Sequence, residues 1–408
     1  MSNAIKNVGF LHKLFRRLSK NRAFRLSKAW LIFLLFMALF GDFVANDKPL
    51  FCRYEGTIQF PIFQEILGLA SPFNETTNWD SPQITSKVFP LIPYHFDTID
   101  PLNSQFKSPF GKQPVKSLRF RHWLGTDQIG RDVFAGMIIG ARVSLVIGFL
   151  GIGFAAMMGI LLGSISGYFG NKRLKWSRLR VIMTLILLVV FSWLAYVLPI
   201  YFGRNGEMNN GLIWAGLLTI WLICQWVLSK VDTTNKTVKL PLDWFVLRAL
   251  EVFKSIPKLL LVLVISAIFP PSIFIVAMVI GVTHWPTITL YMRGEMMKVR
   301  HKEYLIAAQL QGIPEWKILV RHAIPNAIGP ALIAIMLGLG SAILSESFLS
   351  FLGLGIPPDL VSWGKLLAAA RENISAWWLA VFPGLAIFLT IYSANRIGEL
   401  LLEEMKAG

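Results

Sequence analysis

The chain has 408 residues, of which 54% are hydrophobic and only 15% are charged, and its formal net charge is +17. A soluble protein of this length carries more charge, so the composition excludes an ordinary water-soluble fold and indicates a polytopic membrane protein. The excess of Lys and Arg lies beside apolar runs and accompanies no nucleic-acid-binding motif, so it indicates a membrane orientation signal rather than a nucleic-acid partner.

The N-terminal segment 1–28 is strongly basic, with eight Lys or Arg and no acidic residue. Phe10, Leu14 and Phe24 recur within it at roughly helical spacing, a pattern typical of a basic amphipathic helix on an anionic membrane surface. The apolar run 29–45 follows directly. A signal peptide begins in the same way, but no small-x-small cleavage site follows this run. We therefore expect a cytosolic segment and then an uncleaved first transmembrane helix.

Residues 46–133 have a different character. They hold nine of the 21 prolines and no apolar run long enough to cross a membrane, so we expect a large extracytoplasmic loop. The loop ends in HWLGTDQIGRDVF at residues 122–134, where Thr126 or Asp127 can cap the next helix. A second core helix is expected over 134–170, closing in the glycine-rich string GSISGYFG.

The segment 171–242 contains two further apolar runs. They cover 181–202 and 211–228, and each is long enough to span a bilayer. These lengths favour an inserted transmembrane hairpin over a re-entrant one. Two spans return the chain to the side from which it left, so such an insertion preserves the topology of the helices around it.

The last part, 243–400, is expected to hold the remaining core helices and is followed by a tail at 401–408. The expected helices cover 244–269, 273–291, 326–352 and 377–395. With eight spans and an inner N-terminus, the inner segments carry 24 Lys or Arg against 3 in the short outer ones. Because positive charge accumulates on the cytosolic side, both termini are predicted to be cytosolic.

A charged island, residues 293–325, separates two of these apolar runs on the predicted cytosolic side. Lys302 to Leu310 favours a helix with Tyr304, Leu305, Ala308 and Leu310 on its apolar side. Gly312 fits the left-handed position that ends a helix, and Pro314 fits the first turn of the next. A solvated loop with two helical turns is the simpler alternative.

Three strings in the chain carry a family resemblance. Ala307-Ala308, Gly312 and Pro325 have the spacing of the EAA loop of ABC-transporter permeases, although Ile306 stands where that family has its glutamate. Glu303 is a candidate substitute for the missing acid. GTDQIGRDVF at 125–134 and SESFLSFLGLGIPP at 345–358 closely resemble dipeptide and oligopeptide permeases. The resemblance covers about 120–170 and 243–400.

The resemblance implies an all-α polytopic fold, with a type I ABC importer permease core of six helices plus the inserted hairpin. It implies the second permease subunit of a peptide importer in a bacterial inner membrane, working by alternating access. The implied partners are a different permease, two ABC ATPases, an extracytoplasmic substrate-binding protein and membrane lipid. No Gly-x-x-x-x-Gly-Lys-Ser/Thr phosphate loop occurs, so ATP hydrolysis is expected on separate subunits.

The candidate site residues fall into two groups, and no catalytic residue, cofactor or metal site is predicted. The ATPase-coupling loop is implied to contain Glu303, Ala307, Ala308, Gly312, Pro314, His322 and Pro325. Glu346, with Ser350 one turn later, is a candidate for a gate or the translocation path, because acids in membrane helices are costly and often functional. A capped or solvated helix end is the alternative for Glu346.

The sequence alone leaves three other functions to consider. A nickel or other small-solute importer uses a very similar permease, so the resemblance leaves the substrate undecided. A secondary transporter needs ionisable residues near the middle of the bilayer, and the apolar runs offer almost none. A membrane-bound enzyme is disfavoured because no triad, HExxH pair or CxxC pair is present.

Overall fold

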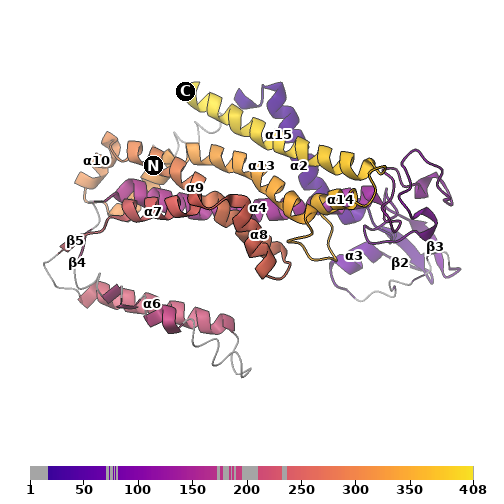
Figure 1. Ribbon diagram of the computed structural model, residues 1–408, viewed down its shortest axis with the longest axis horizontal. Helices are drawn as coiled ribbons and strands as arrows, with labels where there is room; N and C mark the ends of the chain where they lie inside the picture. Colours follow the sequence, from indigo (N-terminus) through magenta and orange to yellow (C-terminus); the bar gives the residue numbers. More distant parts are fainter. Residues whose placement is uncertain are drawn as a thin grey trace. The chain divides into compact units, whose positions relative to one another are not determined.

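The computed structural model is mostly helical (Figure 1). It describes residues 17–69, 73, 77, 79, 81–171, 175–177, 183–184, 186–187, 190–194, 210–231 and 237–407. The chain forms two compact units, one from Met1–Ser164 with Glu251–Gly408 and one from Ile165–Leu250. The first 16 residues of the segment 1–28, over which an amphipathic helix is predicted, lie outside the described residues, as does most of the predicted span 181–202.

Five helices of the described chain are long and apolar enough to cross a membrane. They are α2 (Arg22–Val44), α4 (Val133–Phe169), α9 (Ile273–Val299), α13 (Gly329–Phe351) and α15 (Trp378–Ala407). Each contains or overlaps an apolar run that the sequence marks as a span. α2 begins well before residue 29, so the last basic residues of the N-terminal segment belong to the first membrane helix.

The prediction of one continuous helix over 244–269 is wrong. The chain forms α7 (Leu242–Ser255) and α8 (Lys258–Ile268), with Pro257 as the N-cap of α8. Proline lacks the N–H that would continue the hydrogen-bond ladder and disfavours a helical residue before it, which ends α7. α8 is an apolar helix shorter than a span, whereas α6 (Asn210–Val231), which contains the predicted run 211–228, has 22 residues.

The all-α prediction is also wrong for the loop domain (residues 45–132). Here β1 (Phe51–Tyr54) pairs antiparallel with both β2 (Thr57–Gln59) and β3 (Ile84–Val88). Glu55 and Gly56 both have positive φ, as a tight two-residue hairpin turn requires. Among the residues of the domain that the structure describes, the remaining regular elements are α3 (Pro61–Ile66), η1 (Pro101–Asn103) and η2 (Leu118–Phe120).

The smaller unit brings the two ends of the predicted insertion together. β4 (Lys175–Ser177) pairs antiparallel with β5 (Thr237–Lys239). The Ser166 hydroxyl donates to the Asp243 carboxylate at 2.6 Å, and the Trp244 N–H donates to Asn171 at 2.9 Å. The chain that enters the insertion therefore leaves it beside its starting point.

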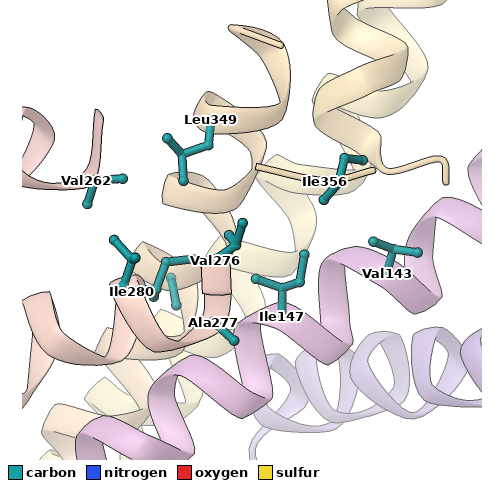
Figure 2. Packing of buried hydrophobic residues seen from close by; sticks show 10 residues of the cluster. Val143, Ile147, Val262, Val276, Ala277, Ile280, Leu349 and Ile356 are labelled. Atoms are coloured by element: carbon teal, nitrogen blue, oxygen red, sulfur yellow. The ribbon is translucent and has the colours of Figure 1, made fainter. Parts of the chain in front are cut away.

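In the larger unit, α13 packs against α15, α9 and α14 (Trp363–Ala369), and α15 packs against α2 (Figure 1). An aliphatic cluster joins α4, α8, α9 and α13 (Figure 2). Its buried members are Val143, Ile147, Val262, Val276, Ala277, Val279, Ile280, Ala342, Leu349 and Ile356. Glycines let α4 approach α9 closely, since a Cβ on Gly163 would lie 2.6 Å from the Thr289 carbonyl oxygen.

Candidate functional site

The charged island is built from short helical pieces. α9 continues to Val299, so the island's first residues complete that helix. α10 (Glu303–Leu310), α11 (Glu315–Ile318), the π-helical turn η3 (Leu319–Ala323) and α12 (Ile324–Ala327) follow. Gly312 has φ +72°, which confirms the predicted left-handed break. Pro314 is the N-cap of α11, one position before its predicted place, and Pro325 lies in the first turn of α12.

The island turns one apolar side inward and another outward. Leu305 and Ala308 of the predicted apolar side are buried, but Leu310, predicted to share that side, is 85% exposed. Ile306, Trp316 and Val320 are exposed as well. A surface of this kind within a charged segment is typical of an interaction site. Of the other predicted coupling residues, Glu303, Ala307, Gly312, Pro314 and Pro325 are exposed and His322 is half-buried.

Glu346 is completely buried within α13, so the prediction of a solvated helix end is wrong. The Ser350 hydroxyl donates to one carboxylate oxygen at 2.7 Å, and the Ser347 hydroxyl lies 3.3 Å from the other. Ser144 of α4 and Ser362, the N-cap of α14, also hydrogen-bond the carboxyl group. This serine cage supplies the hydrogen-bond partners that a buried polar group needs.

Small residues make the serine cage sterically feasible. A Cβ on Gly364 would lie 2.3 Å from the Ser347 carbonyl oxygen, and one on Gly140 would lie 3.3 Å from the Ser362 carbonyl carbon. The backbones of α4, α13 and α14 therefore meet around one carboxyl group. The enclosed carboxyl group therefore has hydrogen-bond partners in all three elements.

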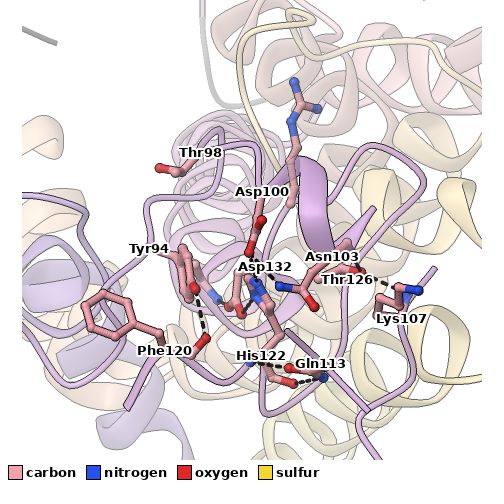
Figure 3. A network of polar contacts seen from close by, with 12 residues as sticks. Tyr94, Thr98, Asp100, Asn103, Lys107, Gln113, Phe120, His122, Thr126 and Asp132 are labelled. Carbon is pink, nitrogen blue, oxygen red and sulfur yellow. Dashed lines mark hydrogen bonds and ion pairs between the residues drawn. The ribbon is translucent and has the colours of Figure 1, made fainter. Parts of the chain in front are cut away.

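A second polar network lies in the loop domain, where the chain enters α4 (Figure 3). His122 is buried, with its Nδ1 atom 2.8 Å from Asp132 and its Nε2 atom 3.3 Å from Asp100. The Asn103 amide donates to the same Asp100 oxygen at 2.7 Å. The Tyr94 ring stacks on the imidazole with 4.3 Å between centroids. The network ties η1 and the domain's last turn to α4.

Asp132, rather than Thr126 or Asp127, caps α4. Its Oδ1 atom accepts from the Ala135 N–H at 2.7 Å. Thr126 instead donates to the Asn103 carbonyl at 2.7 Å, and Asp127 accepts from the Ile129 and Arg131 N–H groups within its own turn. Sequence reasoning chose the wrong cap because the Gly125–Gly130 turn returns the chain before the helix starts.

The network controls the charge of its histidine. Burial alone lowers the pKa of His122, but the hydrogen bonds and negative charges of Asp132 and Asp100 outweigh burial and raise it. For Asp100, burial on its own would raise the pKa, but hydrogen bonds from Asn103 and His122 bring the pKa below its usual value. The sequence shows these residues, but no spacing rule pairs a histidine with acids ten and 22 positions away.

A pocket of about 520 Å³ opens beside this network. It is lined by the start of α4 and by the segment that includes α14. Its charged lining residues carry both signs and are Asp97, Asp127, Arg131, Asp132, Asp359, Lys365, Arg371 and Glu372. Within the described residues, no group of three or more His, Cys, Asp or Glu side chains is placed to hold a metal ion.

Two family models match the chain. Residues 237–406 match the binding-protein-dependent transport system inner membrane component, and residues 9–60 match the N-terminal transmembrane domain of oligopeptide transport permease C. The first match covers α7, α8, α9, the charged island, α13 and α14, with most of α15. The second covers α2 and the first two strands of the loop domain.

Relatives cover most of the chain at modest identity. The dipeptide transport system permease protein DppC of Alkalihalophilus pseudofirmus is 28% identical over 285 residues, 70% of this chain and 71% of the relative. The oligopeptide transport system permease protein OppC of Bacillus subtilis is 25% identical over 313 residues, 76% and 77% of the two chains. The peptidoglycan transport system permease protein YejE of Agrobacterium fabrum is 26% identical over 388 residues, 89% and 83%.

The five long apolar helices, the Gly312-bounded island and the two family matches agree with one another. The chain belongs to the inner membrane permeases of binding-protein-dependent transport systems and is of the OppC/DppC type.

Proposed function

We propose that this chain is the second permease subunit of an ATP-driven importer of dipeptides and oligopeptides. It would form half of the translocation path and work by alternating access. The observation that carries the proposal is the charged island, where Gly312 ends a short helix and Ile306, Leu310 and Trp316 are exposed beside it. An exposed apolar surface on a helix of this length suits docking into a cleft of another subunit.

The proposed assembly contains a different permease, two ABC ATPases that hydrolyse ATP, and an extracytoplasmic substrate-binding protein. The chain itself would contribute a six-helix type I core and an inserted hairpin, about eight spans in all. The charge distribution supports cytosolic termini and a cytosolic island, with the loop domain outside. Glu346 and Ser350 would act by holding the core helices in register as the path opens and closes.

Peptides are favoured over a metal ion by the pocket beside α4. Its lining carries Arg131 and Lys365 as well as Asp97 and Asp359. A peptide presents one charged group of each sign, its amino and carboxyl termini, whereas a nickel ion is attracted by acids and repelled by Arg and Lys. Relatives named for dipeptides, oligopeptides and peptidoglycan leave the length of the solute to experiment.

The coupling role is tested with Gly312→Trp in the assembled transporter in liposomes. A side chain at this left-handed position costs about 1–2 kcal/mol locally. Within the chain a Cβ at this exposed position meets nothing within 4 Å, so we expect the main clash to be with a docked partner. We expect normal membrane insertion and pairing with the other permease, but reduced ATPase co-purification or hydrolysis uncoupled from uptake.

Ile306→Glu is the matched comparison. It restores the residue that the family resemblance places there, at an exposed position, and should be tolerated. Normal ATPase association and normal uptake in Gly312→Trp would mean that the island does not couple the two subunits. Uptake of labelled di- and oligopeptides, a peptidoglycan-derived peptide and nickel by the unaltered transporter identifies the solute class.

The proposed orientation is tested by labelling single cysteines in intact cells. Leu310→Cys and Leu118→Cys are suitable because both side chains are largely exposed. A membrane-impermeant thiol reagent should reach position 118 from outside and leave position 310 unmodified until the cells are opened. The reverse pattern would invert the topology.

A further inference from the structure

A ladder of phenylalanine rings runs from the first membrane helix onto the loop domain. The rings of Phe36 and Phe40 lie 4.9 Å apart, and those of Phe40 and Phe43 lie 6.3 Å apart, along α2. The ladder then crosses to α3, with 4.9 Å between Phe43 and Phe63 and 6.2 Å between Phe63 and Phe60. Each step is within the range of direct aromatic contact, so α3 is held beside the C-terminal end of α2.

The segment around α3 exposes a set of large apolar side chains. This outer apolar patch consists of Ile58, Phe60, Phe63, Ile66, Leu67 and Leu69, each between 48% and 65% exposed. Phe60, Phe63 and Leu67 recur at helical spacing and share one side. Ile62, on the other side, is completely buried, so α3 is anchored in its domain while presenting the patch outward.

The outer apolar patch contains few charged groups that would have to leave water if the patch entered lipid. Glu65 is the one charged residue between positions 58 and 69, and its carboxylate lies 2.6 Å from the Lys48 ammonium. The Gln64 amide donates to the Gln59 side chain at 2.6 Å. These contacts engage the Glu65 carboxylate and the Gln64 side-chain N–H, which lowers the cost of moving them toward lipid, while the buried Gln64 Oε1 atom has no hydrogen-bond partner among the described residues.

The neighbouring surface of α2 indicates what covers the patch. Phe33, Phe36, Leu39 and Phe40 are exposed along this membrane helix, where the surrounding medium is hydrocarbon. The ring ladder makes the outer apolar patch a continuation of that surface. Helices that lie in the membrane surface bury Phe and Leu side chains at the boundary between headgroups and acyl chains, which is where the end of a membrane helix lies.

We propose that the outer apolar patch is a membrane anchor of the loop domain, seated at the headgroup–acyl boundary of the leaflet that α2 meets at its C-terminal end. Its partner is phospholipid. α3 then lies in the membrane surface, and the loop domain is attached to the bilayer at a third point besides its covalent links to α2 and α4. This inference depends on α2 spanning the membrane and not on which solute the permease carries.

The test uses the full chain in phospholipid vesicles, with a nitroxide spin label on a single introduced cysteine. Cys224→Ser removes the less buried native thiol, and Cys52 is buried. The label is placed at Leu67→Cys in the patch. The control is Thr85→Cys, exposed on β3 at the opposite edge of the sheet from β2. The measurement compares how strongly two reagents enhance the spin relaxation of the nitroxide: oxygen, which concentrates in lipid, and a water-soluble nickel chelate.

At position 67 we expect oxygen to be severalfold more effective than the chelate, with the order reversed at position 85. Equal behaviour at the two positions would show a water-exposed patch and overturn the proposal. Exclusion of both reagents at position 67 would show that a protein covers it, which also overturns the proposal. A photoreactive p-benzoylphenylalanine in place of Phe63 gives an independent readout, since it should crosslink to radiolabelled phospholipid and the same group at position 85 should not.

Discussion

His122 is held between two carboxylates in a buried site, and the free energy of unfolding should depend on its protonation. Its pKa is raised in the folded chain, because Asp132 and Asp100 outweigh the effect of burial. The stabilisation is then fully present below the unfolded pKa of about 6.5 and is lost as pH rises through the higher folded pKa. We therefore expect the free energy of unfolding, and with it the apparent Tm, to fall as pH rises through that window.

His122→Gln should flatten this dependence, because glutamine keeps a hydrogen-bonding side chain but does not titrate. His301→Gln, at an exposed site in the charged island, is the matched control and should leave the dependence unchanged. The measurement is the apparent Tm of the purified protein between pH 6 and pH 8. An identical pH profile in His122→Gln and the unaltered protein would show that another group is responsible.

Glu346 offers a second test at the level of one side chain. Glu346→Leu removes the acceptor of the surrounding serine hydroxyls, and each hydroxyl left without a partner costs about 1–3 kcal/mol. Glu346→Gln retains an oxygen acceptor of nearly the same shape and should cost much less. Apparent Tm and the yield of monodisperse protein in detergent distinguish the two variants. Equal loss in both would mean that the carboxyl chemistry itself matters.

The sequence identifies both Glu346 and His122 as notable residues, but it does not predict the contacts that either one makes. Glu346 is visible as an acid next to an apolar run, but its burial depends on Ser144 and Ser362, which come from other elements. His122 lies in a motif that the sequence identifies, yet its contact with Asp100 depends on how η1 folds back. Contacts between distant parts of a chain leave no periodic pattern.

Helix packing around the serine cage depends on the absence of a side chain at one position of α14. In Gly364→Ala the added Cβ would lie 2.3 Å from the Ser347 carbonyl oxygen, so α14 and α13 must separate. Such overpacking costs about 1–3 kcal/mol. We expect a lower apparent Tm and lower uptake for this variant.

Gly384→Ala is the matched control within a long helix. Its Cβ would meet nothing within 4 Å, and alanine is favoured over glycine inside a helix by about 1 kcal/mol. This variant should be as stable as the unaltered protein or more so. If Gly364→Ala and Gly384→Ala change the apparent Tm equally, then helix propensity, and not close packing around Gly364, determines stability at these positions.

Among the elements, those with long apolar runs were predicted well. α9, α13 and α15 contain or nearly contain their predicted spans, because length and hydropathy alone determine a membrane helix. The helix over 244–269 was mispredicted because hydropathy does not register the break that Pro257 imposes. The β1–β2–β3 sheet was missed because its strands are short and alternate weakly.

At the scale of the whole molecule, deletion tests whether the smaller unit is needed for folding, assembly and uptake. The hydrogen bonds of Ser166 with Asp243 and of Asn171 with Trp244 bring the ends of the predicted insertion together. Joining Gly170 to Asp243 through a short linker should therefore leave the larger unit folded. Assembly with the partner permease and part of the uptake should persist.

The measurement is co-purification of the subunits together with peptide uptake in liposomes. A control that replaces the apolar residues of α6 with leucine keeps the length of the insertion while changing its surface. A deletion variant that assembles normally but transports nothing would show that the insertion takes part in transport and is not a peripheral addition.

The serine cage also orders events during synthesis. Ser144 enters the membrane with α4, long before α13 is made, whereas Ser362 follows α13. When α13 first leaves the translocon, Glu346 can meet three of its four hydroxyl partners, two of them on its own helix. The ribosome must extend the chain past α14 before the carboxyl group is enclosed. For that interval one of the four hydroxyl partners is missing, so we expect the packing around Glu346 to be completed only after α14 has emerged.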